Sequence, residues 1–179
     1  YIMSMDHYHY LSTLRSVWES AVASYRGGVN AAGDMFSDEQ SAFLHSIGAT
    51  EQEVFDFVED YVSGGDPDFD TFAAVTDKRR NYFLQVQNGQ HSKHVVQDAD
   101  LPAKTEELDG IVWLPRIIMK AKAKLKGEMN PNLMFSCGGD RRFLKSANLH
   151  AAEFLSLVER NLDDERAIID YVKKADSAH

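Results

Sequence analysis

The chain has 179 residues, 44% of them apolar and 26% charged, which is typical of a globular protein with one domain or two small ones. No apolar run is long enough to cross a bilayer, the first residues lack the regions of a signal peptide, and the single cysteine excludes an intrachain disulfide, so we expect a cytoplasmic protein of bacterial style without a membrane partner. The net charge of −9 is carried by residues 1–90, which contain 14 Asp and Glu but only 5 Lys and Arg. Such an acidic half argues against nucleic-acid binding, which needs a basic surface.

Apolar residues at helical spacing predict four helices in the first half of the chain. Capping boxes that begin at Ser37 and Thr50 mark the starts of the second and third helices, and Gly27-Gly28 ends the first. The break "SGGDP" at 63–67 separates the third helix from a longer fourth one. The apolar stripes of these helices lie within residues 11–25, 37–48, 54–62 and 72–86.

Residues 88–109 form the predicted linker, which begins with the turn signal Asn88-Gly89 and contains one short extended piece at Val95-Val96. The second half of the chain then repeats the helical order. Pro115 suits the first turn of its first helix, and Asp140 is expected to cap the short second one. No segment alternates polar and apolar residues for long enough to predict a strand.

Several short motifs occur twice, which indicates an internal duplication. The paired motifs are Met35-Phe36-Ser37 with Met134-Phe135-Ser136, Phe43-Leu44 with Phe143-Leu144, Val58-Glu59 with Val158-Glu159, and Trp18 with Trp113. We therefore predict an all-α fold in which two tandem, pseudo-equivalent repeats of about four helices each, residues 1–87 and 110–179, pack as one compact unit. The alternative is two unrelated helical segments that share common residue types.

Three motifs of the second half carry a resemblance to a known family. The runs "VWLPR" at 112–116, "GGDRRF" at 138–143 and "AAEFL" at 151–155 together resemble a bacterial family catalogued only as a domain of unknown function. The resemblance covers about residues 104–175, and "GDMFSDEQ" at 33–40 is similar to the N-terminal part of the longer family members. It implies a helical fold and brings no activity, cofactor or catalytic residue.

The segment "CGGDRR" places cations where a helix disfavours them. The first turn of a helix favours acidic side chains, as in Asp38-Glu39 of the first copy, but the second copy has Arg141 and Arg142 there, behind Gly138-Gly139. Glycines let a backbone approach a ligand closely, and helix N-termini with added guanidinium groups suit a carboxylate or a phosphate. The alternative is that Asp140 or another nearby carboxylate neutralises the two arginines.

The helix that follows Trp113 is strongly basic. Arg116, Lys120 and Lys124 share one stripe, which is either a solvated face or a docking face for an acidic partner or for the acidic first copy. Arg116 again lies at a helix start, against the dipole, and is expected to join Arg141 and Arg142 around one anion.

Cysteine and histidine offer weaker candidates. Cys137 lies beside the arginines, a setting that suits a nucleophile with His150 as its base, although a cysteine next to a core aromatic residue more often serves packing. His7 and His9 alternate in "HYH" and offer two metal ligands, but no third ligand is evident. We therefore expect no metal and no other cofactor.

Two functions remain open. In the first, a small anionic molecule binds in the seam between the repeats, where Trp18 and Asp34 of the first repeat join the arginines of the second; Asp34 and Asp140 are then acid–base candidates if the molecule is transformed. In the second, the protein is a non-catalytic module that binds a protein partner or forms a homodimer. The common nucleotide-binding, hydrolase and metalloprotease motifs are missing from the sequence, so neither a reaction nor a substrate is predicted.

Overall fold

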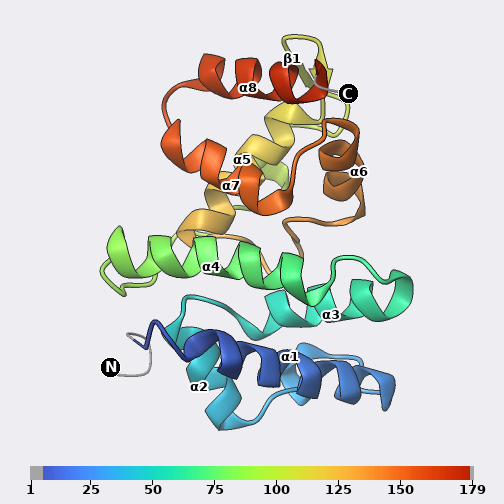
Figure 1. Cartoon of the computed structure of the whole chain (residues 1–179), viewed down its shortest axis with the longest axis vertical. Helices are drawn as coiled ribbons and strands as arrows, with labels where there is room; N and C mark the ends of the chain where they lie inside the picture. The colour runs from blue at the N-terminus through green and yellow to red at the C-terminus, as the bar shows by residue number, and fades with distance from the viewer. Residues whose placement is uncertain (1–5, 178–179) are drawn as a thin grey trace. The chain divides into compact units, whose positions relative to one another are not determined.

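The computed structural model describes residues 6–177 and consists mostly of helices (Figure 1). Within these residues it contains eight α-helices, two short 3₁₀ helices and one two-stranded hairpin, which confirms the predicted helical fold class. The chain divides into two compact units, with the boundary between His91 and Ser92. Each unit contains four α-helices, and the proposed duplication stays a prediction that a superposition of the two units would test.

In the N-terminal unit, α1 packs against α3 and α4. The indole of Trp18 on α1 stacks on Phe72 of α4 with 4.8 Å between ring centroids, and Phe57 of α3 meets Phe72 edge to face at 5.3 Å. These buried rings form the centre of the unit. The elements are α1 (Tyr10–Arg26), η2 (Ala32–Asp34), α2 (Asp38–Ser46), α3 (Glu51–Gly64) and α4 (Phe69–Gln85).

Local capping explains where the helices of this unit begin. The side chain of Ser37 accepts a hydrogen bond from the backbone N–H of Gln40, and Thr50 does the same for Glu53, so both predicted capping boxes are confirmed. Helix α3 ends at Gly65, whose φ of +81° is a left-handed conformation that glycine adopts without strain.

In the C-terminal unit, α5 packs against α7 along an apolar stripe (Figure 1). Ile117 and Leu125 of α5 and Leu155 and Val158 of α7 are fully buried. The elements are η3 (Asp98–Asp100), β1 (Glu107–Leu108), β2 (Ile111–Val112), α5 (Leu114–Lys126), α6 (Gly138–Ser146), α7 (Ala151–Arg160) and α8 (Glu165–Ser177).

Most of the predicted linker is a packed part of this second unit. The Val96 backbone bridges the chain after α5, donating to Glu128 O at 2.7 Å, and the Val96 and Leu101 side chains are buried with Ala123. The β1–β2 hairpin turns at Asp109-Gly110, and both residues have positive φ. Asp-Gly is a strong hairpin signal, and the prediction that no strand occurs overlooked it because each strand has only two residues.

One ionisable group of the N-terminal unit gives a pH-dependent prediction. Burial raises the pKa of Asp56 on α3 from an ordinary 3.8 to about 6, and the nearby carboxylates of Glu59 and Asp60 add to the rise, although a hydrogen bond from Gln52 opposes it. The folded state therefore binds this proton more tightly than the unfolded state. The resulting contribution to stability is fully present below about pH 4 and is lost as the pH rises through about 6.

Replacing Asp56 with asparagine removes this proton linkage. We expect Asp56→Asn to raise the free energy of unfolding at pH 7 by about 1–2 kcal/mol and to flatten its decline between pH 4 and pH 6. Urea unfolding between pH 4 and pH 7.5 measures both effects. Glu19→Gln, which neutralises an exposed carboxylate on α1, is the control; equal pH profiles for the two variants would contradict the assignment.

Candidate functional site

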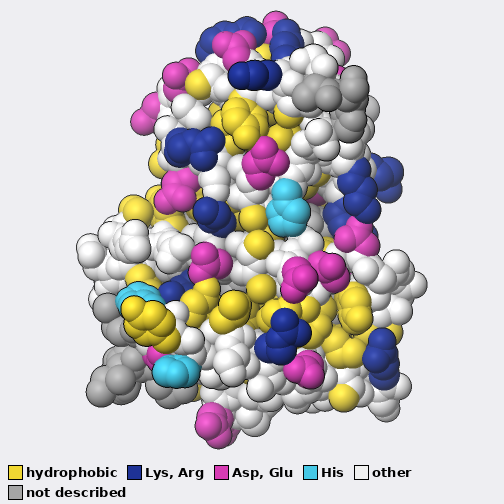
Figure 2. Space-filling view, viewed as in Figure 1, with side chains coloured by type: hydrophobic (Ala, Val, Ile, Leu, Met, Phe, Trp, Pro, Cys, Tyr) yellow, Lys and Arg dark blue, Asp and Glu magenta, His cyan; other side chains and the backbone are white. Residues whose placement is uncertain are grey.

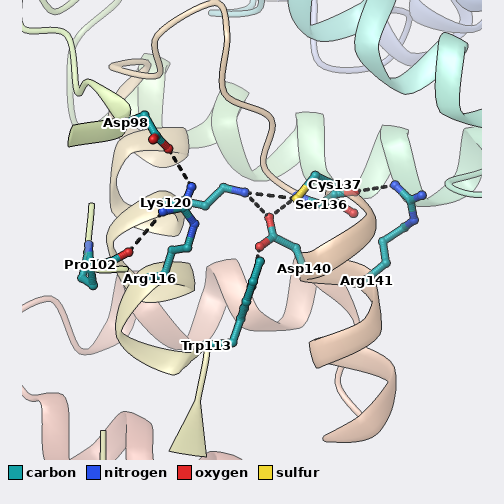
Figure 3. A network of polar contacts seen from close by, with 9 residues as sticks. All are labelled: Asp98, Pro102, Trp113, Arg116, Lys120, Ser136, Cys137, Asp140 and Arg141. Atoms are coloured by element: carbon teal, nitrogen blue, oxygen red, sulfur yellow. Dashed lines mark hydrogen bonds and ion pairs between the residues drawn. The ribbon is translucent and has the colours of Figure 1, made fainter. Parts of the chain in front are cut away.

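A buried carboxylate, Asp140, joins three segments of the C-terminal unit (Figure 3). One oxygen, Oδ1, accepts from Trp113 Nε1 at 2.8 Å. The other, Oδ2, accepts from Lys120 Nζ at 2.6 Å and from the Ser136 backbone N–H at 2.9 Å. Asp140 is fully buried and is the third residue of α6, so it does not cap the helix as predicted; Cys137 takes the N-cap position.

Two donors to this carboxylate lie on strained backbone. Trp113 has φ of +78° and Ser136 has φ of +73°, conformations that cost about 1–3 kcal/mol for residues with a side chain. Trp113 donates through its indole and Ser136 through its backbone N–H, and both hydrogen bonds end on Asp140. The buried charge therefore helps to hold both residues in conformations that the chain would otherwise avoid.

Gly139 makes room for the indole of Trp113. A Cβ at this position would overlap the Trp113 ring, 2.5 Å from Cη2. At Gly138 the nearest atom to such a Cβ is Arg142 Nη1 at 3.8 Å, which is ordinary contact. The close packing of Trp113 on the first turn of α6 thus explains one glycine of the pair, and space does not require the other.

A second buried cation, Arg116, lies one turn before Lys120 on α5. Its Nη2 donates to Asp98 Oδ1 at 2.7 Å and its Nη1 to Pro102 O at 3.1 Å, whereas its buried Nε has no hydrogen-bond partner. The Arg116 side chain is 8% exposed and that of Asp98 is 72% exposed. The hydrogen bond and charge of Arg116 lower the pKa of Asp98 below its ordinary value.

Asp98, Arg116 and Lys120 line one cavity of about 380 Å³ within the C-terminal unit. Four of its lining residues are cationic and one is acidic. The cations are Lys104, Arg116, Lys120 and Arg142; the acid is Asp98; the remaining lining residues are Trp113, Asn132, Leu133, Met134, Cys137 and Gly139. On the face drawn in Figure 2, Lys and Arg side chains also gather over α6, which carries the exposed Arg142 and Lys145.

The structure brings together most of the residues predicted for the anion site in the second repeat. Arg116, Trp113, Gly139 and Arg142 line the cavity, as does Cys137. Gly138 and Arg141 do not line it, and Arg141 Nη1 instead donates to Ser136 O at 2.8 Å. The predicted base His150 caps α7, accepting from the Ala152 N–H at 3.0 Å.

Three charged lining residues were not among the predicted site residues: Asp98, Lys104 and Lys120. Asp98 and Lys104 belong to the segment read as a linker. Lys120 belongs to the basic stripe of α5, which is not a solvated face, because Arg116, Lys120 and Lys124 are 7%, 2% and 4% exposed. The spacing of three cations on one stripe was the signal available in the sequence. Spacing alone does not distinguish buried from exposed cations.

The candidates from the first half of the chain lie in the N-terminal unit. Trp18 is buried in its aromatic core, and Asp34 is an exposed residue at the end of η2. His9 Nδ1 contacts Asp6 Oδ1 at 3.0 Å, and His7 Nδ1 lies 3.2 Å from Arg80 Nη2. Among residues 6–177, no group of three His, Cys, Asp or Glu side chains is arranged to hold a metal ion.

Residues 98–179 match the family model described as domain of unknown function DUF5069. This match confirms the resemblance to a domain of unknown function, and every residue that lines the cavity falls within the matched range. No curated protein and no solved structure matches the chain. None of the helices in the described part of the chain is both long and apolar enough to span a bilayer.

The two glycines provide a matched pair of variants. We expect Gly139→Ala to lower the free energy of unfolding by about 2–3 kcal/mol, because the new methyl group forces Trp113 off Asp140. Gly138→Ala should change it by less than about 1 kcal/mol, since the methyl group fits and alanine favours the helix. Chemical denaturation with tryptophan fluorescence measures both, and equal effects would contradict the packing role of Gly139.

The buried ion pair gives a prediction from a double-mutant cycle. Lys120→Met leaves the Asp140 charge without its cation and should destabilise the protein by about 3 kcal/mol. Asp140→Asn should cost a similar amount. The double variant should cost less than the sum of the two by at least about 1 kcal/mol, because neither charge is then left alone. Additive losses in urea unfolding would show that the pair is not coupled.

Proposed function

We propose that the C-terminal unit binds a small organic anion in the cavity next to Trp113. The observation that carries the proposal is the composition of the cavity wall, where four cationic side chains meet a single acidic one. Trp18 and Asp34, predicted for the same site, are not part of this proposal because they lie in the other unit.

The charges around the cavity favour an anion. Asp140, behind the wall, offsets Lys120, and Asp98 offsets Arg116. Four cations against these two carboxylates leave an excess of two positive charges, contributed by Lys104 and Arg142 at exposed positions. Like charges gathered at a partly enclosed surface repel one another, and a bound anion relieves that repulsion.

The wall also suits the remainder of a small organic molecule. Guanidinium and ammonium groups bind carboxylate and phosphate oxygens through charge-assisted hydrogen bonds. Trp113, Leu133 and Met134 supply apolar surface for a carbon skeleton. A volume of about 380 Å³ lies at the small end of the range of about 300–1,000 Å³ that is usual for ligand pockets.

We propose binding and assign no reaction step. Asp140 is fully buried and receives three hydrogen bonds, so it is not placed to accept a proton from a ligand. Cys137 lines the cavity with its Sγ 3.3 Å from Lys120 Nζ, but the Lys120 charge is already paired with Asp140 at 2.6 Å. Neither group has the free partner that an acid–base or nucleophilic role requires.

A thermal-shift measurement tests the proposal. Succinate or inorganic phosphate, at about a hundred times its dissociation constant, should raise the melting temperature by about 5–10 °C. Arg142→Gln removes an exposed cation from the rim and should weaken binding about fivefold without loss of stability.

The matched control is Arg160→Gln, which removes an exposed arginine of α7 that does not line the cavity. This variant should bind as tightly as the natural protein. Equal weakening by the two substitutions would show that the anion senses only net charge, and the absence of any shift with either anion would refute the proposed function.

A further inference from the structure

We propose that Asp98 occupies the place of the ligand's carboxylate on Arg116, that a bound carboxylic acid displaces it, and that the ligand is therefore a small carboxylate. This inference rests on the proposed function and names the ligand class and the residue that controls access to the cavity. It makes Asp98 a specificity-determining residue: an anion binds only if it can replace the internal carboxylate.

The first observation is that the hydrogen-bonding capacity of Arg116 is incompletely used. The residue is only 7% exposed, and yet its Nε has no hydrogen-bond partner. An arginine carries five N–H donors, and a buried donor without an acceptor is costly. The cavity wall therefore contains a buried cation with one N–H donor that has no acceptor.

The second observation concerns the edge of the guanidinium group that carries this donor. The Nε–H and one N–H of Nη2 lie parallel on the same side of a guanidinium group, which is why carboxylates bind there through both oxygens. Asp98 reaches only Nη2, at 2.7 Å. A ligand carboxylate that is free to orient itself can take both donors and so make one more charge-assisted hydrogen bond than Asp98 does.

The third observation is that Asp98 can leave at little cost. Its side chain is 72% exposed and lies on η3, a helix of three residues, so water can solvate it after release. Asp140 provides the contrast within the same site, since it is fully buried and held by three donors. Of the two carboxylates beside the cations, only Asp98 can be exchanged for a ligand.

The ligand class follows from the group that Arg116 already binds, which is the Asp98 carboxylate. The Arg116 edge holds a planar carboxylate, so a ligand carboxylate fits the same donors without rearrangement of the guanidinium group. A second carboxylate on the ligand would meet the rim cations Lys104 and Arg142. Succinate, a short dicarboxylate, is therefore the probe of choice, and inorganic phosphate is the comparison.

Calorimetric titration of the full chain with succinate tests the inference. Asp98→Asn keeps a hydrogen-bond acceptor but removes the competing charge, so succinate should bind about fivefold to tenfold more tightly than to the natural protein. Asp98→Glu, which retains the charge, should not tighten binding. Asp163→Asn, which removes an exposed carboxylate of the same unit outside the cavity lining, should leave binding unchanged.

A spectroscopic readout separates displacement from a general effect of charge. The Arg116 Nε–H resonance in a ¹⁵N correlation spectrum, assigned by its loss in Arg116→Gln, should move downfield when succinate binds, because that donor gains an acceptor. In the Arg116→Gln background, Asp98→Asn should no longer tighten binding. The melting temperature of each variant confirms that it is folded.

Several results would overturn the inference. If Asp98→Asn weakens succinate binding, or matches Asp163→Asn, then Asp98 does not compete with the ligand. If phosphate binds and succinate does not, the ligand class is wrong although the proposed anion binding stands. If neither anion binds to the natural protein or to Asp98→Asn, the inference and the proposed function fail together.

Discussion

The burial of one carboxylate organises the C-terminal unit. Asp140 is removed from water and is stabilised there only because three donors converge on it, from the start of α5, from the middle of α5 and from the loop before α6. Its bonds to Trp113 and Ser136 hold two left-handed residues in place, and its bond to Lys120 fixes a buried ammonium group at the cavity wall. The position of α6 relative to α5 depends on this convergence.

The two ion pairs beside the cavity differ in a way that separates structural from functional charge. Lys120 and Asp140 are 3% and 0% exposed, so each requires the other. Arg116 is also buried, but its partner Asp98 is largely in water and uses one donor of Arg116. An ion pair with one solvated member contributes little to stability, and such a pair suits a site where one carboxylate is exchanged for another.

Local signals predicted the helices well and predicted the site only in part. The capping boxes at Ser37 and Thr50 were readable because all of their atoms lie within four residues of chain. The side-chain partners of Asp140 lie 20 and 27 residues away, and periodicity carries no information on such contacts. Residues 88–109 were read as a linker because their few apolar residues show no repeat and their one strand, β1, has only two residues. Asp98 was missed for the same reason.

The close contact between Gly139 and Trp113 links two positions that lie 26 residues apart in sequence. An indole at position 113 and a Cβ at position 139 cannot occupy the same space, so a change at either position alters what the other can tolerate. Among relatives of this chain, the two positions should therefore covary: where a smaller side chain replaces the aromatic ring, position 139 should tolerate residues other than glycine.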